Sequence, residues 1–315
     1  MTVDLLVDAG CEVAENPLWH PETKQLYWTD VPAGRLYRYE PRRDTHGCVF
    51  DGEPVGGFTL QQDGSFLLFT SGGRIKAWHE GGPTKLVTTA TDETETRFND
   101  VVADPCGRVF CGTMPTEQRL GRLYQLHTDG SLTRLLEGVN VSNGLGFSPD
   151  LNRLYYAETR AGRIHSFAYS RETGGIRNRQ CFVDWRDEPG VPDGLAVDAE
   201  GHVWVAMWDW GCLVRVTPAG DVDHRYELPV ARPTSLTFGG QDGRSVFVTT
   251  ANALDASSDA AAGGVFRLRS PVGGGPWFRS AVAVDSLLRD VSLVRAHHAR
   301  KKRGSIKYAK ISLYP

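Results

Sequence analysis

Four residues with oxygen-bearing side chains stand at matching positions in this chain, although they lie far apart along it. Glu15, Asn99, Asn143 and Asp193 each precede a short apolar stretch, as in "NGLGFSPD" from Asn143. Carboxylate and carboxamide oxygens, with no His or Cys among them, are the donors that a hard divalent cation prefers. The sequence therefore predicts a metal site, provided that the fold brings these side chains together.

The four residues belong to a repeat that runs along most of the chain. Each copy has a polar or small residue, an apolar strand, a turn and a second strand rich in aromatic and β-branched residues. The copies are "ENPLWHPETKQLYWTD" from 15, "GGFTLQQDGSFLLFT" from 56, "NDVVADPCGRVFCGT" from 99, "NGLGFSPDLNRLYYAE" from 143, "DGLAVDAEGHVWVAM" from 193 and "TSLTFGGQDGRSVFVTT" from 234. A period of about 40 to 50 residues is typical of propellers and solenoids.

Each copy continues with a third strand, such as "RLYRY" at 35–39, and after a turn with a fourth strand, such as "LTRLLEG" at 132–138. Helical periodicity is absent almost everywhere. The sequence therefore predicts an all-β protein, a six-bladed β-propeller with four-stranded blades. The first residues, "VDLLVDAG", resemble the fourth strand that precedes every other copy, so we expect the N-terminal strand to close the ring.

The first strand of each blade lines the central channel of a propeller, so matching positions of the repeat converge on one axis. The six residues at the start of that strand are Glu15, Gly56, Asn99, Asn143, Asp193 and Thr234. A single Asn-Gly or Asp-Gly is more often an ordinary turn. A turn residue would recur in every blade, however, whereas this position varies, and the variation favours a special site.

These segments resemble the SMP-30/gluconolactonase family. The resemblance rests on "AENPLWHP" (14–21), "RFNDVVADPCGRVFCGTM" (97–114), "SNGLGFSPD" (142–150), "VPDGLAVDAEGHVWVA" (191–206) and "RPTSLTFGG" (232–240), and it covers residues 1 to about 269. It implies that a divalent metal is held by Glu15, Asn143 and Asp193. It also implies that substrate is bound by Arg97, Asn99 and Glu117.

The resemblance, together with a metal site of this kind, implies the hydrolysis of a sugar lactone, such as gluconolactone, to its hydroxy-acid. A cation with open positions polarises the lactone carbonyl and acidifies a bound water. Asp193 is then the expected general base, and Arg97 the expected partner of the oxyanion. Ca²⁺ is the first expectation for the cation, with Zn²⁺, Mn²⁺, Mg²⁺ and Fe²⁺ as alternatives. Two other functions stay open: hydrolysis of another lactone or of a phosphotriester, and a non-catalytic calcium-binding propeller.

Composition limits the partners. The net charge of −3 gives no electrostatic reason to expect nucleic acid, and no apolar stretch is long enough to span a membrane. The six cysteines form no CxxC pair, and the N-terminus has no secretory pattern. We therefore expect a cytoplasmic protein with free thiols, whose partner is a small-molecule lactone. The oligomeric state is left open.

The chain divides into two predicted parts. Residues 1–269 form the propeller with its axial metal site, and residues 270–315 form a C-terminal extension. The segment "RAHHARKKRGSIKYAK" at 295–310 is strongly basic. We expect it to be solvated and partly disordered rather than to contact nucleic acid.

Overall fold

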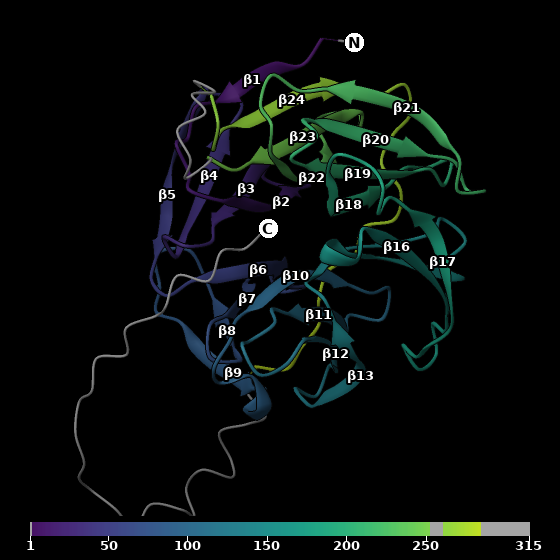
Figure 1. Cartoon of the computed structure of the whole chain (residues 1–315). Helices are drawn as coiled ribbons and strands as arrows, with labels where there is room; N and C mark the ends of the chain where they lie inside the picture. The colour runs from purple at the N-terminus through teal and green to yellow at the C-terminus, as the bar shows by residue number, and fades with distance from the viewer. Residues whose placement is uncertain (1, 253–260, 285–315) are drawn as a thin grey trace, which may run out of the picture.

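Six four-stranded antiparallel sheets stand around a common axis in the computed structural model of the chain (Figure 1). The structure describes residues 2–252 and 261–284. The predicted six-bladed, all-β propeller is confirmed. Within this described part, helical structure is limited to two single-turn 3₁₀ helices, η1 (Thr91–Glu93) and η2 (Thr159–Ala161), and no helix could span a membrane.

The first three blades follow the order of the chain. Blade 1 contains β2 (Ala14–His20), β3 (Gln25–Asp30), β4 (Arg35–Glu40) and β5 (Thr45–Asp51). Blade 2 contains β6 (Val55–Leu60), β7 (Phe66–Thr70), β8 (Arg74–Trp78) and β9 (Lys85–Thr89). Blade 3 contains β10 (Phe98–Ala103), β11 (Val109–Thr113), β12 (Gly121–Leu126) and β13 (Leu132–Val139).

The remaining blades repeat this pattern, except that the last combines both ends of the ring. Blade 4 contains β14 (Ser142–Phe147), β15 (Arg153–Glu158), β16 (Arg163–Tyr169) and β17 (Ile176–Asp184). Blade 5 contains β18 (Val191–Val197), β19 (Val203–Trp208), β20 (Cys212–Val216) and β21 (Val222–Glu227). Blade 6 contains β22 (Pro233–Gly239), β23 (Ser245–Thr250), β24 (Val265–Arg269) and β1 (Asp4–Val7).

Pairing of β1 with β24 closes the ring, as expected from the sequence. The register places Asp4 opposite Arg267, and a further bridge joins Val13 to Ala251. The first and last blades are thereby joined by a backbone bridge, and the chain that completes blade 6 continues directly into blade 1.

The hydrophobic core lies between neighbouring blades. Second strands such as β7 and β19 are almost entirely apolar because both of their faces are covered, and the fully buried side chains include Trp28, Phe69 and Phe98. Phe69 of blade 2 packs edge-to-face on Phe98 of blade 3, with ring centroids 5.5 Å apart. Aromatic contacts of this kind hold adjacent blades in register. The six cysteines are all free.

All six inner strands carry an irregularity near their first residues. In β10, for example, Phe98 pairs with Thr113 but Val101 pairs with Cys111, so the inner strand contains one extra residue. The same irregularity occurs in β2, β6, β14, β18 and β22. A β-bulge of this kind redirects side chains and is common next to active sites. Here it falls at the positions that the repeat aligned.

Residues 270–284, named the strap below, cross the opposite end of the channel. Backbone hydrogen bonds join the strap to blades 2, 3, 5 and 6, for example from Ser280 N–H to the Leu60 carbonyl. Phe278 packs on Phe147 of blade 4, and Arg279 pairs with Glu22 of blade 1. The part of the predicted C-terminal extension that the structure describes is thus in contact with every blade. The basic segment 295–310 lies outside the described residues, and the domain boundary at 269 stays a prediction.

Candidate metal and substrate site

The inner strands bring five of the six predicted site residues together at one end of the channel. These residues, named the hub cluster, are Glu15 on β2, Arg97 and Asn99 at the start of β10, Asn143 on β14 and Asp193 on β18. They are far apart in sequence and meet because each begins the first strand of its blade. Their convergence follows from the architecture; their roles as ligands stay predictions.

A chain of hydrogen bonds runs through the hub cluster from one blade to the next. Nη1 of Arg97 donates to Oδ1 of Asn99 at 2.7 Å. Nδ2 of Asn99 donates to the Ser142 carbonyl at 2.8 Å and to Oδ1 of Asn143 at 3.2 Å. Nδ2 of Asn143 in turn donates to Oγ1 of Thr159 at 3.0 Å. Both carboxamides are thereby held in fixed orientations.

The two carboxylates of the hub cluster are buried close enough to disturb each other. Glu15 is 7% exposed and Asp193 is 0% exposed. Burial, followed by repulsion from Asp193 and Asp100, raises the pKa of Glu15 well above its ordinary value, although the Asn16 N–H and Arg97 oppose this. Two buried like charges are costly unless a cation lies beside them.

A second polar layer, which the sequence analysis did not identify, lies just below the hub cluster in the channel. Oδ1 of Asp100 accepts hydrogen bonds from its neighbour Val101 N–H at 2.7 Å and from Asn16 Nδ2 at 3.4 Å. Asn16 also accepts the Phe58 N–H at 2.6 Å, which links blades 1, 2 and 3. Burial raises the pKa of Asp100 to about 6. Because of the bulge, the consecutive residues Asn99 and Asp100 both place their side chains at this end of the channel. The sequence could have predicted this only if the bulge itself had been predicted.

The other two aligned positions have structural roles. The Thr234 hydroxyl donates to the Ala14 carbonyl at 2.6 Å and bonds to Thr249 at 2.8 Å, so it joins blade 6 to blade 1. A Cβ at Gly56 would lie 1.9 Å from the Phe98 carbonyl oxygen, so only glycine fits there. The residue type at the aligned position therefore differs between blades for a reason: it is polar where the side chain belongs to the hub cluster, and it is Gly or Thr where the residue contacts a neighbouring blade.

The glycines that follow two hub residues permit close backbone contacts, as expected. A Cβ on Gly144 would lie 2.6 Å from the Asp193 carbonyl oxygen, and one on Gly194 would lie 2.2 Å from Oγ of Ser235. Backbone strain accompanies this tight packing. Val141, two residues before Asn143, has a φ of 65°, a left-handed conformation that a β-branched residue rarely adopts. Strain of this kind is characteristic of functional sites.

Glu117, the sixth predicted site residue, is placed differently. It is exposed on the loop between β11 and β12, which leaves the blade at the same end as Arg97, since the Met114 N–H donates to the Arg97 carbonyl. Arg119, two residues further on, anchors this loop to the buried Glu93. The structure therefore puts Glu117 on the rim of the site and not in the hub cluster.

The donor set of the hub cluster fits a hard divalent cation. No group of three or more His, Cys, Asp and Glu side chains that could hold a metal occurs in residues 2–252 and 261–284. A cation at the hub would therefore need the carboxamide oxygen of Asn143 in addition to the Glu15 and Asp193 carboxylates. Such an oxygen-only set suits Ca²⁺, Mg²⁺ or Mn²⁺, and the cation would remove the repulsion between the two buried carboxylates.

Comparison with known proteins gives a family and several relatives. The sequence family described as "SMP-30/Gluconolactonase/LRE-like region" matches residues 13–252. The pentonolactonase XacC of Haloferax volcanii is 43% identical over 290 residues, which cover 90% of this chain and 99% of that protein. The regucalcin of Macaca fascicularis is 32% identical over 280 residues, covering 84% and 93%.

A solved structure supports the fold independently. A luciferin-regenerating enzyme superposes with a TM-score of 0.82 at 23% identity, over 90% of this chain and 99% of its own. At that identity the likeness concerns the propeller alone. The family match and the two relatives extend across blades that carry the whole hub cluster.

Proposed function

Because the chain belongs to the SMP-30/Gluconolactonase/LRE-like family, we propose that it is a divalent-metal-dependent lactonase that opens a sugar lactone to its hydroxy-acid. The observation that carries the proposal is the hub cluster, in which two buried carboxylates and two oriented carboxamides meet at one end of the channel. A relative named as a pentonolactonase, similar over nearly its whole length, supports the reaction class.

In this proposal Glu15, Asn143 and Asp193 hold the cation. Ca²⁺ is the first candidate, and Zn²⁺, Mn²⁺, Mg²⁺ and Fe²⁺ are alternatives. When bound, such a cation supplies Lewis acidity to the lactone carbonyl and lowers the pKa of a water. The oxygen of Asn143 faces this site because its amide nitrogen is directed to Thr159.

The protein groups then perform the proton transfer and the positioning. Asp193 accepts a proton from the attacking water while the oxygen of that water forms a bond to the carbonyl carbon of the lactone. The bond from that carbon to the ring oxygen then breaks, and the ring oxygen leaves as a hydroxyl after taking up the proton that Asp193 had accepted. The Arg97 guanidinium, held against Asn99 by a 2.7 Å hydrogen bond, stabilises negative charge on the former carbonyl oxygen.

Substrate recognition would come from the rest of the cluster. Arg97 can donate to the hydroxyls of a sugar lactone, Asn99 can accept a hydroxyl through its carboxamide oxygen because both of its N–H groups are already bonded, and Glu117 can accept a hydroxyl from the rim of the site. Aldonolactones are therefore the proposed substrate class. Pentonolactones come first among them because of the relative's name, with gluconolactone next.

A panel of sugar lactones, assayed by acid release, tests the proposal. The protein would be treated with a chelator, dialysed and reloaded with each of the five cations. We expect no turnover after chelation and restored turnover of at least one five- or six-carbon aldonolactone with one of the cations. Turnover that persists unchanged after chelation would overturn the metal dependence.

The alternative functions are outcomes of the same experiment. Turnover of a phosphotriester such as paraoxon without turnover of any lactone would replace the substrate class and leave the metal site in place. Tight calcium binding without turnover of any substrate tested would favour the non-catalytic calcium-binding propeller. Either result would leave the six-bladed fold as described.

A further inference from the structure

The orientation of the Asn99 side chain can be deduced from its two unambiguous partners. The Arg97 guanidinium can only donate, so the Asn99 atom at 2.7 Å from it is the carbonyl oxygen. The Ser142 backbone carbonyl can only accept, so the atom at 2.8 Å from it is the amide nitrogen. Asn99 therefore presents its nitrogen to blade 4.

This orientation determines that of Asn143. Since the Asn99 nitrogen lies 3.2 Å from the Asn143 side chain, Asn143 must turn its own oxygen toward Asn99 and the hub. Its nitrogen consequently points away from the hub, where Oγ1 of Thr159 accepts it at 3.0 Å. A cation can bind only the oxygen of a carboxamide, so a flipped Asn143 would present two N–H groups to it.

Thr159 is well suited to hold this amide because its own position is fixed. It is 0% exposed and begins η2. Its N–H donates to the Val141 carbonyl at 3.1 Å, and its carbonyl accepts the Gly162 N–H at 2.9 Å. The preceding residue, Glu158, accepts the Asn140 N–H at 2.8 Å and Nη2 of Arg179 at 2.7 Å. The turn that carries Thr159 is therefore tied to the segment that leads into β14.

The equivalent positions in other blades indicate that the fold itself does not require a hydroxyl here. In four other blades the equivalent residue also donates its N–H to the carbonyl of the segment before the inner strand: Val31 in blade 1, Ser71 in blade 2, Met114 in blade 3 and Ala251 in blade 6. Three of these four residues have no hydroxyl, and the Ser71 hydroxyl bonds to Glu53 at 3.4 Å. A hydroxyl at this position beside Asn143 therefore has a local purpose.

We propose that Thr159 is a positioning residue of the metal site, which acts through Asn143 by holding the carboxamide oxygen toward the hub. The inference rests on the proposed function, since it takes Asn143 as a ligand. Partners behind metal ligands typically contribute 10- to 100-fold in affinity. Thr159 has no contact with the cation in this scheme and is not itself a ligand.

The test measures Ca²⁺ affinity by calorimetry on the full-length chain. Thr159→Val keeps the shape of the side chain and removes the acceptor, so we expect the Kd for Ca²⁺ to rise about 10-fold or more. Thr159→Ser restores the hydroxyl and is expected to bind within about threefold of wild type. Thr159→Ala is measured alongside, so that the result does not depend on how well the valine variant folds.

Thr70→Val is the matched control. Thr70 is a fully buried threonine of blade 2 whose hydroxyl donates to the Arg74 carbonyl at 3.0 Å, and blade 2 has no member of the hub cluster. We expect it to lower the melting temperature in chelator without changing the Kd. A merely structural role for Thr159 predicts the same behaviour as Thr70.

The outcomes separate the two proposals. If wild type binds Ca²⁺ and the valine and alanine variants bind it equally well, the role of Thr159 is overturned while the proposed function stands. If wild type binds none of the five cations, both proposals fall. A loss of affinity in both variants that serine reverses, with unchanged melting temperatures in chelator, supports the positioning role.

Discussion

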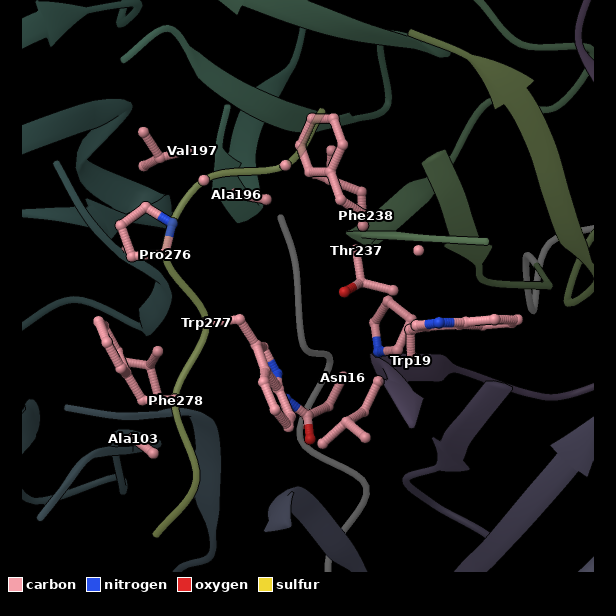
Figure 2. Close-up of a pocket in the computed structure, with 18 of the residues that line it drawn as sticks. Asn16, Trp19, Ala103, Ala196, Val197, Thr237, Phe238, Pro276, Trp277 and Phe278 are labelled. Carbon is pink, nitrogen blue, oxygen red and sulfur yellow. The ribbon is translucent and has the colours of Figure 1, made fainter. Parts of the chain in front are cut away.

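At one end of the central channel the inner strands begin in bulges, and two of them carry the buried carboxylates Glu15 and Asp193. At the other end three of them finish with the aromatic residues Trp19, Phe147 and Phe238, and the strap crosses all six. The strap end encloses a cavity of about 370 Å³. Pro276, Trp277 and Phe278 lie along one side of it, and Trp19 and Phe238 along the other (Figure 2). The two ends are separated by only about four residues of strand, or roughly 13 Å.

This difference shows that the two ends of the same inner strands contribute to different properties, one end to the candidate site and the other to stability. The hub end keeps two carboxylates in mutual repulsion and a valine in a left-handed conformation, features that cost stability. The strap end adds backbone hydrogen bonds and aromatic contacts, which contribute stability. Substitutions at the hub should therefore change activity, and substitutions at the strap should change stability.

The largest effect is expected for Asp193→Asn. If Asp193 is the base and a metal ligand, as proposed, its loss should lower kcat/KM by about 10³-fold or more. The melting temperature in chelator should stay the same or rise, because repulsion with Glu15 is removed. Lactone turnover and thermal unfolding of the same preparation provide both measurements.

Thr237→Val, on the inner strand of blade 6 beside the cavity, is the matched change at the strap end. It should leave kcat/KM within about twofold of wild type. If Asp193→Asn retained more than a tenth of wild-type turnover, Asp193 would lose its assigned role as base.

Two glycines on one strand provide the next comparison. In Gly144→Ala the new Cβ would lie 2.6 Å from the Asp193 carbonyl oxygen, a backbone atom that cannot move alone. We expect a loss of about 3 kcal/mol in the free energy of unfolding and at least a 10-fold weaker Kd for Ca²⁺. Denaturant unfolding and calorimetry would measure these quantities.

Gly146→Ala, two residues further along β14, is the control. The close neighbours of its Cβ would be side-chain methyl groups, Cδ1 of Leu195 at 2.9 Å and Cγ2 of Val197 at 3.0 Å, while the nearest backbone atom, Val197 N, would lie at an ordinary 3.9 Å. Because these methyl groups can rotate, the expected loss is about 1 kcal/mol with unchanged cation affinity. Equal losses of affinity in both variants would show that the hub is no more rigid than the rest of the strand.

The sequence was sufficient for the architecture because the repeat is strong. Six copies with the same strand order imply six blades, and "VDLLVDAG" matched the missing fourth strand of blade 6, where β1 now stands. The strap could not be predicted in the same way. It belongs to no repeat, and its contacts, such as Ser280 with Leu60, join residues more than 200 positions apart.

The site was predictable only as far as the repeat aligned it. The convergence of Glu15, Asn143 and Asp193 follows from their matching positions. Asn16 and Asp100 were missed because simple alternation places consecutive strand residues on opposite faces, and the bulges break that rule. Thr159 was missed because it lies on a connecting turn outside the aligned inner strands, and the sequence around it gives no indication of a contact with Asn143.

A smaller effect is expected where the strap is held. The buried Gln61 side chain donates to the Val282 carbonyl at 3.1 Å and accepts its N–H at 2.8 Å. Gln61→Ala leaves both backbone groups without these partners, so it should cost about 2 kcal/mol in the free energy of unfolding. Turnover by the folded variant at 25 °C should be unchanged. Gln118→Ala, on the exposed loop of blade 3, should cost less than about 0.5 kcal/mol. A large loss of turnover in Gln61→Ala would show that the two ends of the channel are coupled.

The pH-dependent effect concerns Asp100, which lies between the two ends. Its pKa of about 6 in the folded chain exceeds the ordinary value of 3.8, so the folded state holds this proton more tightly than the unfolded state. The stability that the proton contributes is present below about pH 4 and is lost as pH rises through 6. In chelator, Asp100→Asn should therefore match wild type near pH 4 and exceed its free energy of unfolding by about 3 kcal/mol at pH 7. Denaturant unfolding at both pH values measures the difference, and a variant that is less stable than wild type at pH 7 would contradict it. The expected result would show that Asp100 accounts for part of the stability lost through buried charge at the hub. This agrees with the contribution of the Asp100 carboxylate to the raised pKa of Glu15.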